Sequence, residues 1–131
     1  MVIVAIIGLF STIALTSLSG SRQKGNDAAV KQQLREIQNA AELYALANYN
    51  KYGVAATCDE GMFVNEKFDP LFAALDKASL EAEVQCRSTN AGYAVQTALI
   101  SNPDIYWCVD ATGYKGGSEY SELVRPRCPG H

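Results

Sequence analysis

The sequence predicts an α+β protein in which one long N-terminal helix packs on a small antiparallel sheet, giving a lollipop-like shape. Three observations predict it. The first 52 residues carry two successive helix patterns, one wholly apolar and the next amphipathic. Two segments after residue 90 have the aromatic and β-branched composition of strands. Four widely spaced cysteines suggest disulfides that stabilise a small head in an oxidising compartment.

The apolar opening, residues 1–18, contains no charge and no proline. As a helix it spans about 27 Å, close to the thickness of the hydrocarbon core of a bilayer. A cleaved secretory signal has a basic start and a shorter apolar stretch, so a single-pass anchor is the better-supported interpretation. Arg22 and Lys24 follow it and would favour a cytoplasmic C-terminus, which conflicts with disulfides.

After Gly25 the pattern becomes amphipathic. Asn26 or Asp27 can cap a helix start, and Gly53 is a plausible stop, so 1–52 is expected as one helix of roughly 75–80 Å. A coiled coil is the alternative, but the apolar stripe is shorter than about three heptads. The stripe recurs in alternating steps of four and three and is expected to pack on the sheet; its members are Val30, Leu34, Ile37, Ala41 and Tyr44.

The two halves of this helix divide the chain. Residues 1–25 form the apolar half, and residues 26–131 form the globular head with the amphipathic half. In the head, 54–69 is expected as a loop. The segment 69–84, DPLFAALDKASLEAEV, is expected as a short helix that Asp69 caps.

The sheet is expected from three later segments. GYAVQTALI (92–100) and IYWCVDA (105–111) have strand composition and are separated by an Asn-Pro-Asp turn. TGYKGGSE (112–119) is expected as a loop. YSELVRPRC (120–128) is expected as a short third strand, limited by Pro126.

The four cysteines allow three disulfide connectivities. Sequential pairing, Cys58 with Cys86 and Cys108 with Cys128, is favoured because it closes the shortest loops. Each bridge would contribute roughly 3 kcal/mol if unstrained. Non-reducing peptide mapping should find these two pairs.

The sequence contains no motif that indicates catalysis, a cofactor or a metal site. The only histidine is the terminal His131, so no nucleophile–base pair is available, and zinc-type cysteine spacings and phosphate loops are absent from the sequence. The net charge of −3 and the absence of a basic stripe argue against nucleic acid as the main ligand. We therefore expect no enzyme activity, no cofactor and no metal.

Two weaker candidates remain open in the C-terminal part. An acidic loop either binds calcium or, more readily, is a solvated surface; its residues are Asp110, Ser118, Glu119 and Glu122. Tyr114 and Tyr120 either meet a partner or pack within the head.

The segments VIVAIIGLFSTIAL, SGSRQKGNDAAVKQQLREIQNAAELYALANYNKYG and IYWCVDATG together resemble bacterial type IV pilins and pseudopilins. The resemblance implies a filament subunit whose apolar half-helices bundle in the filament centre while the heads form its surface. The assembly positions that it implies are Val2, Ile3, Val4, Ile6, Ile7, Gly8, Leu9, Phe10, Ile13, Leu15 and Leu18. Small residues among them let helices approach closely.

The resemblance also implies partners and location. Members of the family are inserted in the inner or cytoplasmic membrane with the head outside and are then extracted by a pilus assembly machine. The expected product is a helical homo-oligomer, an extracellular pilus on the cell surface. Its role would be adhesion, motility or DNA uptake.

Two features depart from the family pattern. The family's apolar hexapeptide with a glutamate lies upstream of the segment that matches Met1, so either the numbered sequence lacks several residues or the chain is a shortened pilin. Thr16 stands where the family often has a helix-bending proline, and family filaments often lose helicity between the positions that match Gly8 and Thr16. Glycine also weakens a helix by roughly 1 kcal/mol, so we expect bending or melting at Gly8, Thr16 and Gly20.

Two other functions remain as alternatives. One is a pseudopilin or minor pilin of a secretion or competence system, which forms no long fibre. The other is a membrane-anchored binding domain. Abundant thin filaments of this chain in sheared surface material would favour a major pilin.

Overall fold

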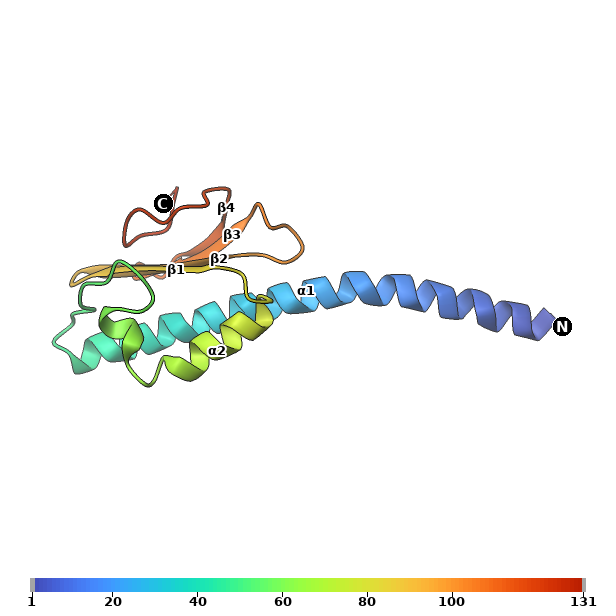
Figure 1. The fold of residues 1–131 in the computed structure, drawn as a ribbon, viewed down its shortest axis with the longest axis horizontal. Helices are drawn as coiled ribbons and strands as arrows, with labels where there is room; N and C mark the ends of the chain where they lie inside the picture. Colours follow the sequence, from blue (N-terminus) through green and yellow to red (C-terminus); the bar gives the residue numbers. More distant parts are fainter. Residues whose placement is uncertain (1, 131) are drawn as a thin grey trace.

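The computed structural model describes the backbone of residues 2–130 and the side chains of residues 20–130. The α+β architecture with a long N-terminal helix is confirmed (Figure 1). The four strands form one antiparallel sheet in the order β1-β2-β3-β4. The elements are α1 (Val2–Ala47), the 3-10 helix η1 (Gly61–Val64), α2 (Asp69–Ala78), β1 (Val84–Thr89), β2 (Gly92–Ala98), β3 (Tyr106–Asp110) and β4 (Lys115–Ser118).

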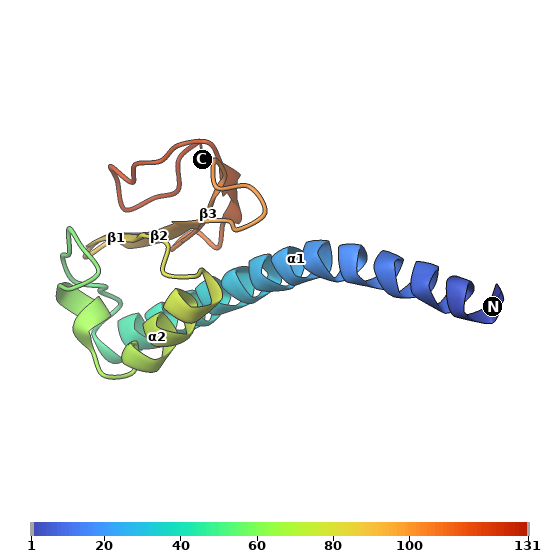
Figure 2. The same cartoon turned by 45° about the vertical axis from the view of Figure 1, so that its right-hand side comes forward.

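The head has three layers, which Figures 1 and 2 show from two directions. The second half of α1 and the shorter α2 lie on one face of the sheet. The C-terminal segment 119–130 crosses the opposite face, and we call it the strap. The first half of α1 continues beyond the head as a gently curved rod, which we call the stalk (residues 2–25).

The helix α1 ends at Ala47, so the predicted end at residue 52 is wrong. Tyr49 and Asn50 both have φ of 60°, the left-handed conformation that closes many helices. The Asn50 amide donates to the Ala45 carbonyl at 2.7 Å, and the Asn48 side chain donates to the Tyr44 carbonyl at 2.8 Å. These two bonds satisfy carbonyls of the last turn, so the chain turns toward the sheet five residues earlier than expected.

The sheet contains the two strands expected around 92–111 and differs from the prediction on both sides of them. The strand β1 was not predicted, because 69–84 was interpreted as helix to its end, whereas α2 stops at Ala78. The strand β4 lies in the segment predicted to be a loop. The segment 120–128, predicted to be a third strand, has no strand structure and forms most of the strap.

Glycine allows the short strand β4 to pair closely with β3. A Cβ added at Gly117 would lie 2.8 Å from Cγ2 of Ile105 and 3.6 Å from the Trp107 ring. Trp107 is also the residue that Gly117 faces across the two strands. A residue with a side chain would therefore push this pair apart.

Two helical segments also differ from expectation. The expected loop 54–69 contains η1, whose Met62 and Phe63 are buried in the core. Asp69 is the first residue of α2 and makes no capping hydrogen bond, so its predicted capping role is wrong.

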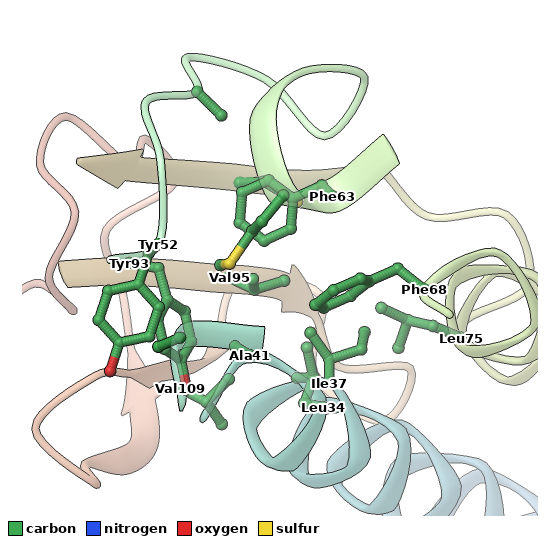
Figure 3. Close-up of a cluster of buried hydrophobic side chains, with 14 of the residues drawn as sticks. Leu34, Ile37, Ala41, Tyr52, Phe63, Phe68, Leu75, Tyr93, Val95 and Val109 are labelled. Atoms are coloured by element: carbon green, nitrogen blue, oxygen red, sulfur yellow. The ribbon is translucent and has the colours of Figure 1, made fainter. Parts of the chain in front are cut away.

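The hydrophobic core lies between the helices and the sheet. Figure 3 shows Leu34, Ile37 and Ala41 directed from α1 toward side chains of α2 and the sheet. Aromatic rings fill the end of the core near η1, where the ring centroids of Phe63 and Phe68 are 6.1 Å apart. A smaller cluster on the other face of the sheet joins the strap to it and comprises Ala94, Cys108, Leu123 and Cys128.

Candidate functional site

The stalk is the first candidate for a functional surface, because this part of α1 extends beyond the head instead of packing against it (Figure 1). The side chains of 20–25 are exposed. The predicted assembly positions from Val2 to Leu18 lie outside the described side chains. Within the part of the chain that the structure describes, no helix combines the length and the apolar character needed to cross a membrane.

The three predicted bend positions are helical in the single chain. The backbone is α-helix at Gly8, Thr16 and Gly20, so α1 is not interrupted there. A Cβ added at Gly20 would meet no atom within 4 Å, so this glycine is not required by packing in the single chain. Loss of helicity in an assembled filament stays a prediction.

The predicted stripe of α1 is the surface by which this helix joins the head. Val30, Leu34, Ile37 and Ala41 have no exposed surface and belong to the main core. Tyr44 is half-buried and contacts the ring of Phe68 edge-on, at 6.5 Å between centroids, so it meets the 65–68 turn. The stripe therefore sets the orientation of the stalk relative to the head.

Asp27 fixes the point at which α1 leaves the head, a role that the sequence analysis missed. Its predicted capping role is wrong, because α1 is continuous through this position. The side chain is 7 % exposed, and one carboxylate oxygen accepts the amides of Ile100 and Ser101 at 2.7 Å and 3.2 Å. The Ser101 hydroxyl donates to the other oxygen. The carboxylate thus holds the β2–β3 loop against α1.

Replacing Asp27 by alanine should destabilise this junction. Loss of a charged acceptor leaves the partly buried amides of Ile100 and Ser101 without their partner, which costs about 1.5–3 kcal/mol. Denaturant unfolding of the full chain should show this loss, and hydrogen exchange should accelerate first at Ile100 and Ser101. The control is Asp104→Ala, in the same loop but exposed, which should leave unfolding nearly unchanged. Equal effects of the two variants would contradict the assigned role.

A second polar contact joins α1 to β3. The side-chain amide of Gln38 donates to the backbone carbonyl of Asp110 at 3.0 Å, and the Tyr93 hydroxyl donates to the carbonyl of Gln38 at 3.2 Å. Farther toward the stalk, Lys31 places its ammonium nitrogen 4.2 Å from the centre of the Trp107 ring. Such a cation–π contact stabilises by roughly 0.5–1 kcal/mol at an exposed site.

Tyr52 marks the far end of this junction. Its hydroxyl donates to the carboxylate of Glu42 at 3.1 Å. Burial, followed by the negative charge of Glu42, raises the pKa of Tyr52 to about 12. The same two causes raise the pKa of Tyr93 further.

Alkaline titration should report this environment. Below pH 10 Tyr52 is neutral in both the folded and the unfolded chain, so its contribution to stability is fully present there; that contribution is lost as the pH rises from about 10 through about 12. Absorbance at the tyrosinate band should contain a phase near pH 12. Tyr52→Phe should remove the phase, whereas Tyr49→Phe, at an exposed position, should retain it. A phase that survives in Tyr52→Phe would contradict the assignment.

Two disulfides bind the sheet to its neighbours. They join Cys58 to Cys86 and Cys108 to Cys128, the pairs favoured by the sequence analysis. The first links the segment after α1 to β1, and the second links β3 to the strap. Neither includes a residue of α1.

The acidic loop is not assembled as a cation site. The Asp110 side chain is 1 % exposed and accepts the amides of Thr112 and Cys128 at 2.9 Å and 3.0 Å. It thus organises the turn before β4 and the end of the strap, whereas Glu119 and Glu122 are exposed. The described residues contain no group of three or more His, Cys, Asp or Glu side chains suited to a metal.

The two tyrosines left open by the sequence differ in their surroundings. Tyr114 is half-buried and packs on the cluster that joins the strap to the sheet. Tyr120 is 64 % exposed.

A shallow groove lies beside the first disulfide, between η1, α2 and the start of β1. Its volume is about 460 Å³. Phe63, Val64 and Phe72 supply apolar surface. Four exposed carboxylates line it, those of Asp59, Asp69, Asp76 and Glu83. We call it the acidic groove.

The arrangement as a whole offers surfaces for contact with other molecules. Its strongest features are a protruding helix, a junction of buried apolar and hydrogen-bonded contacts that attaches this helix to the head, and a charged groove on the head. No protein-family model matches the sequence, and neither the curated proteins nor the solved structures include a significant match.

Proposed function

We propose that the chain is a structural subunit of an extracellular type IV pilus filament, assembled through its apolar N-terminal helix. One observation carries the proposal. The second half of α1 contributes its apolar stripe to the core of the head, and the first half of the same helix protrudes as the stalk. A subunit built in this way can place its stalk among other stalks while its head remains outside.

The chemistry of the stalk supports this assembly. Residues 2–18 have no charged side chain, so they are suited to lipid before assembly and to a bundle of like helices afterwards. Apolar burial is retained in such a transfer, and packing at small residues then selects the geometry. The proposed partners are the membrane, the pilus assembly machinery and further copies of the chain.

The head is suited to the outer surface of a filament. Two disulfides tie its small sheet to the neighbouring segments, which restricts the unfolded chain and compensates for a limited core. Oxidising conditions outside the cytoplasm maintain such bridges. The proposed location is therefore the cell surface, with the chain as a single-pass membrane protein before assembly.

Electron microscopy of sheared surface material tests the function. Antibodies against the head should label abundant thin filaments, and a reconstruction should place residues 2–25 at the filament centre. Labelled chain that remains in the membrane fraction without filaments would contradict the proposal. Small assemblies with secretion or uptake proteins would then indicate a pseudopilin or minor pilin, and isolated membrane-bound chains would indicate an anchored binding domain.

A further inference from the structure

We infer that neighbouring subunits bind each other through the acidic groove of one head and a row of cations on α1 of another copy. This inference rests on the proposed filament and names the second copy of the chain as the occupant of the groove. The row, which we call the basic ridge, consists of Lys24, Lys31 and Arg35.

The basic ridge is a single face of a helix. Lys24 and Lys31 are seven residues apart, and Arg35 follows after four more, so the three side chains project in nearly the same direction. Lys24 and Arg35 are exposed, and Lys31 is half-buried against Trp107. Like charges four residues apart on a helix destabilise it by about 0.2–0.5 kcal/mol. An acidic partner would relieve this repulsion.

The acidic groove has a complementary row. Asp69 and Asp76 lie seven residues apart on α2, which again places them on one helical face. The separation along the axis is about 10.5 Å for seven residues of helix, the same as between Lys24 and Lys31. Two helices side by side can therefore pair both charges at once.

Neither row is neutralised within its own chain. Among residues 20–130, no Lys or Arg nitrogen lies within 4.0 Å of an Asp or Glu oxygen. The segment 59–83, which carries the groove, has seven acidic residues and only two basic ones. By contrast, the only acidic residue before position 36 is Asp27, whose carboxylate is buried against the β2–β3 loop.

The apolar floor of the groove makes the contact more than a pair of exposed charges. Phe72 is half-buried and Val64 is 58 % exposed, so both have apolar surface that a neighbour can cover. The methylene stems of Lys and Arg can lie on such surface while their charges reach the carboxylates. The ridge starts at the end of the stalk and continues along the part of α1 that carries the head (Figure 1), so a neighbouring copy shifted along the helix axis can place its α2 beside it.

Charge reversal and rescue test the inference in the full chain. The ridge variant is Lys24→Glu with Lys31→Glu, the two cations whose spacing matches the groove, and the groove variant is Asp69→Lys with Asp76→Lys. Each should lower the filament yield by about tenfold, since several weak pairs are replaced by repulsion. The combined fourfold variant should recover the yield to within about threefold of the original chain.

The matched control is Lys51→Glu with Lys115→Glu, two exposed cations outside the ridge. It has the same change in net charge and should keep the original yield. Because Lys31 also contacts Trp107, the unfolding midpoint of the ridge variant should agree with that of Lys31→Gln alone, and those of the groove and control variants with that of the original chain. Lys24→Gln with Lys31→Gln replaces the ridge variant if that variant misfolds. Unchanged filaments in the ridge and groove variants, or no recovery in the combined variant, would overturn the inference but leave the proposed function intact.

Carbodiimide cross-linking provides a direct second measurement. Filaments assembled from a mixture of isotope-labelled and unlabelled chains should yield peptides that join Lys24 or Lys31 of one chain to Asp69 or Asp76 of another. Cross-links of these lysines only to other carboxylates, or to a different protein, would exclude the assigned pairing. Absence of filaments from the unmodified chain would contradict the proposed function and this inference together.

Discussion

Replacing Leu34 by alanine should lower the free energy of unfolding by about 3–4 kcal/mol. Leu34 has no exposed surface and lies in the middle of the stripe that joins α1 to the head. The change removes three buried carbon atoms and leaves a cavity that the surrounding helices and sheet fill only in part. The loss is a large fraction of the 5–15 kcal/mol typical of a domain. Urea unfolding of the full chain in detergent, followed by tyrosine fluorescence, measures it.

The same helix provides a matched control. Leu43 is 67 % exposed, so Leu43→Ala removes the same atoms from a position where few contacts exist. We expect a change within about 0.5 kcal/mol. Similar losses in the two variants would mean that the stripe does not carry the packing energy of the head.

Removing the bridge between Cys108 and Cys128 should cost about 3.3 kcal/mol. The two residues are separated by 20 positions, and loss of the link frees a loop of that length in the unfolded chain. The variant Cys108→Ala with Cys128→Ala avoids placing polar atoms in a site where both sulfurs are buried. Thermal unfolding under non-reducing conditions measures the loss.

Loss of the Cys108–Cys128 bridge and loss of the Cys58–Cys86 bridge should expose different parts of the head. The strap is also held by the Gln85 side chain, which donates to the Ser121 carbonyl at 2.8 Å and accepts the Leu123 amide at 2.8 Å. Hydrogen exchange in the variant should therefore increase first at the strap amides of Leu123 and Cys128. Cys58→Ala with Cys86→Ala should instead expose 54–60 and β1. The same exchange pattern in both variants would contradict the separate roles.

Local periodicity made the long helix and its buried stripe predictable. Each residue from Val30 to Ala41 in that stripe is identified by spacing alone, because one face of a helix must be apolar to pack on a core. The strands β2 and β3 were predictable for the corresponding reason, since Tyr93, Val95 and Val109 are side chains that favour strands.

The errors occurred where contacts distant in the sequence decide the structure. The strand β4 contains Gly116 and Gly117, which disfavour strands locally but permit close pairing beside Trp107. The strap contains Leu123 and Val124, which resemble a strand, yet its backbone bonds to side chains of β1. Tertiary partners reversed the local preference in both cases.

The role of Asp27 could not be predicted for the same reason. Its nearest signal is local, an acidic residue after a glycine, which indicates a helix cap. Its true partners lie 73 and 74 positions away, in the β2–β3 loop. The acidic groove could not be predicted from the sequence either, because Asp59, Asp76 and Glu83 come together only when η1, α2 and β1 have packed.

The absence of α1 from both disulfides has a mechanical consequence. Until the backbone segment 48–57 is stretched, a pull along the stalk is transmitted to the head by noncovalent contacts, with Asp27 nearest the applied force and the buried stripe behind it. Those contacts share the load in shear, because the force runs parallel to the helix axis. If α1 slides out, only the ten residues 48–57 can extend before Cys58 is reached, by at most about 35 Å. Beyond that length the pull passes through the Cys58–Cys86 bridge to β1 and its paired strands, so the length of one short segment limits how far α1 can slide before the sheet carries the load.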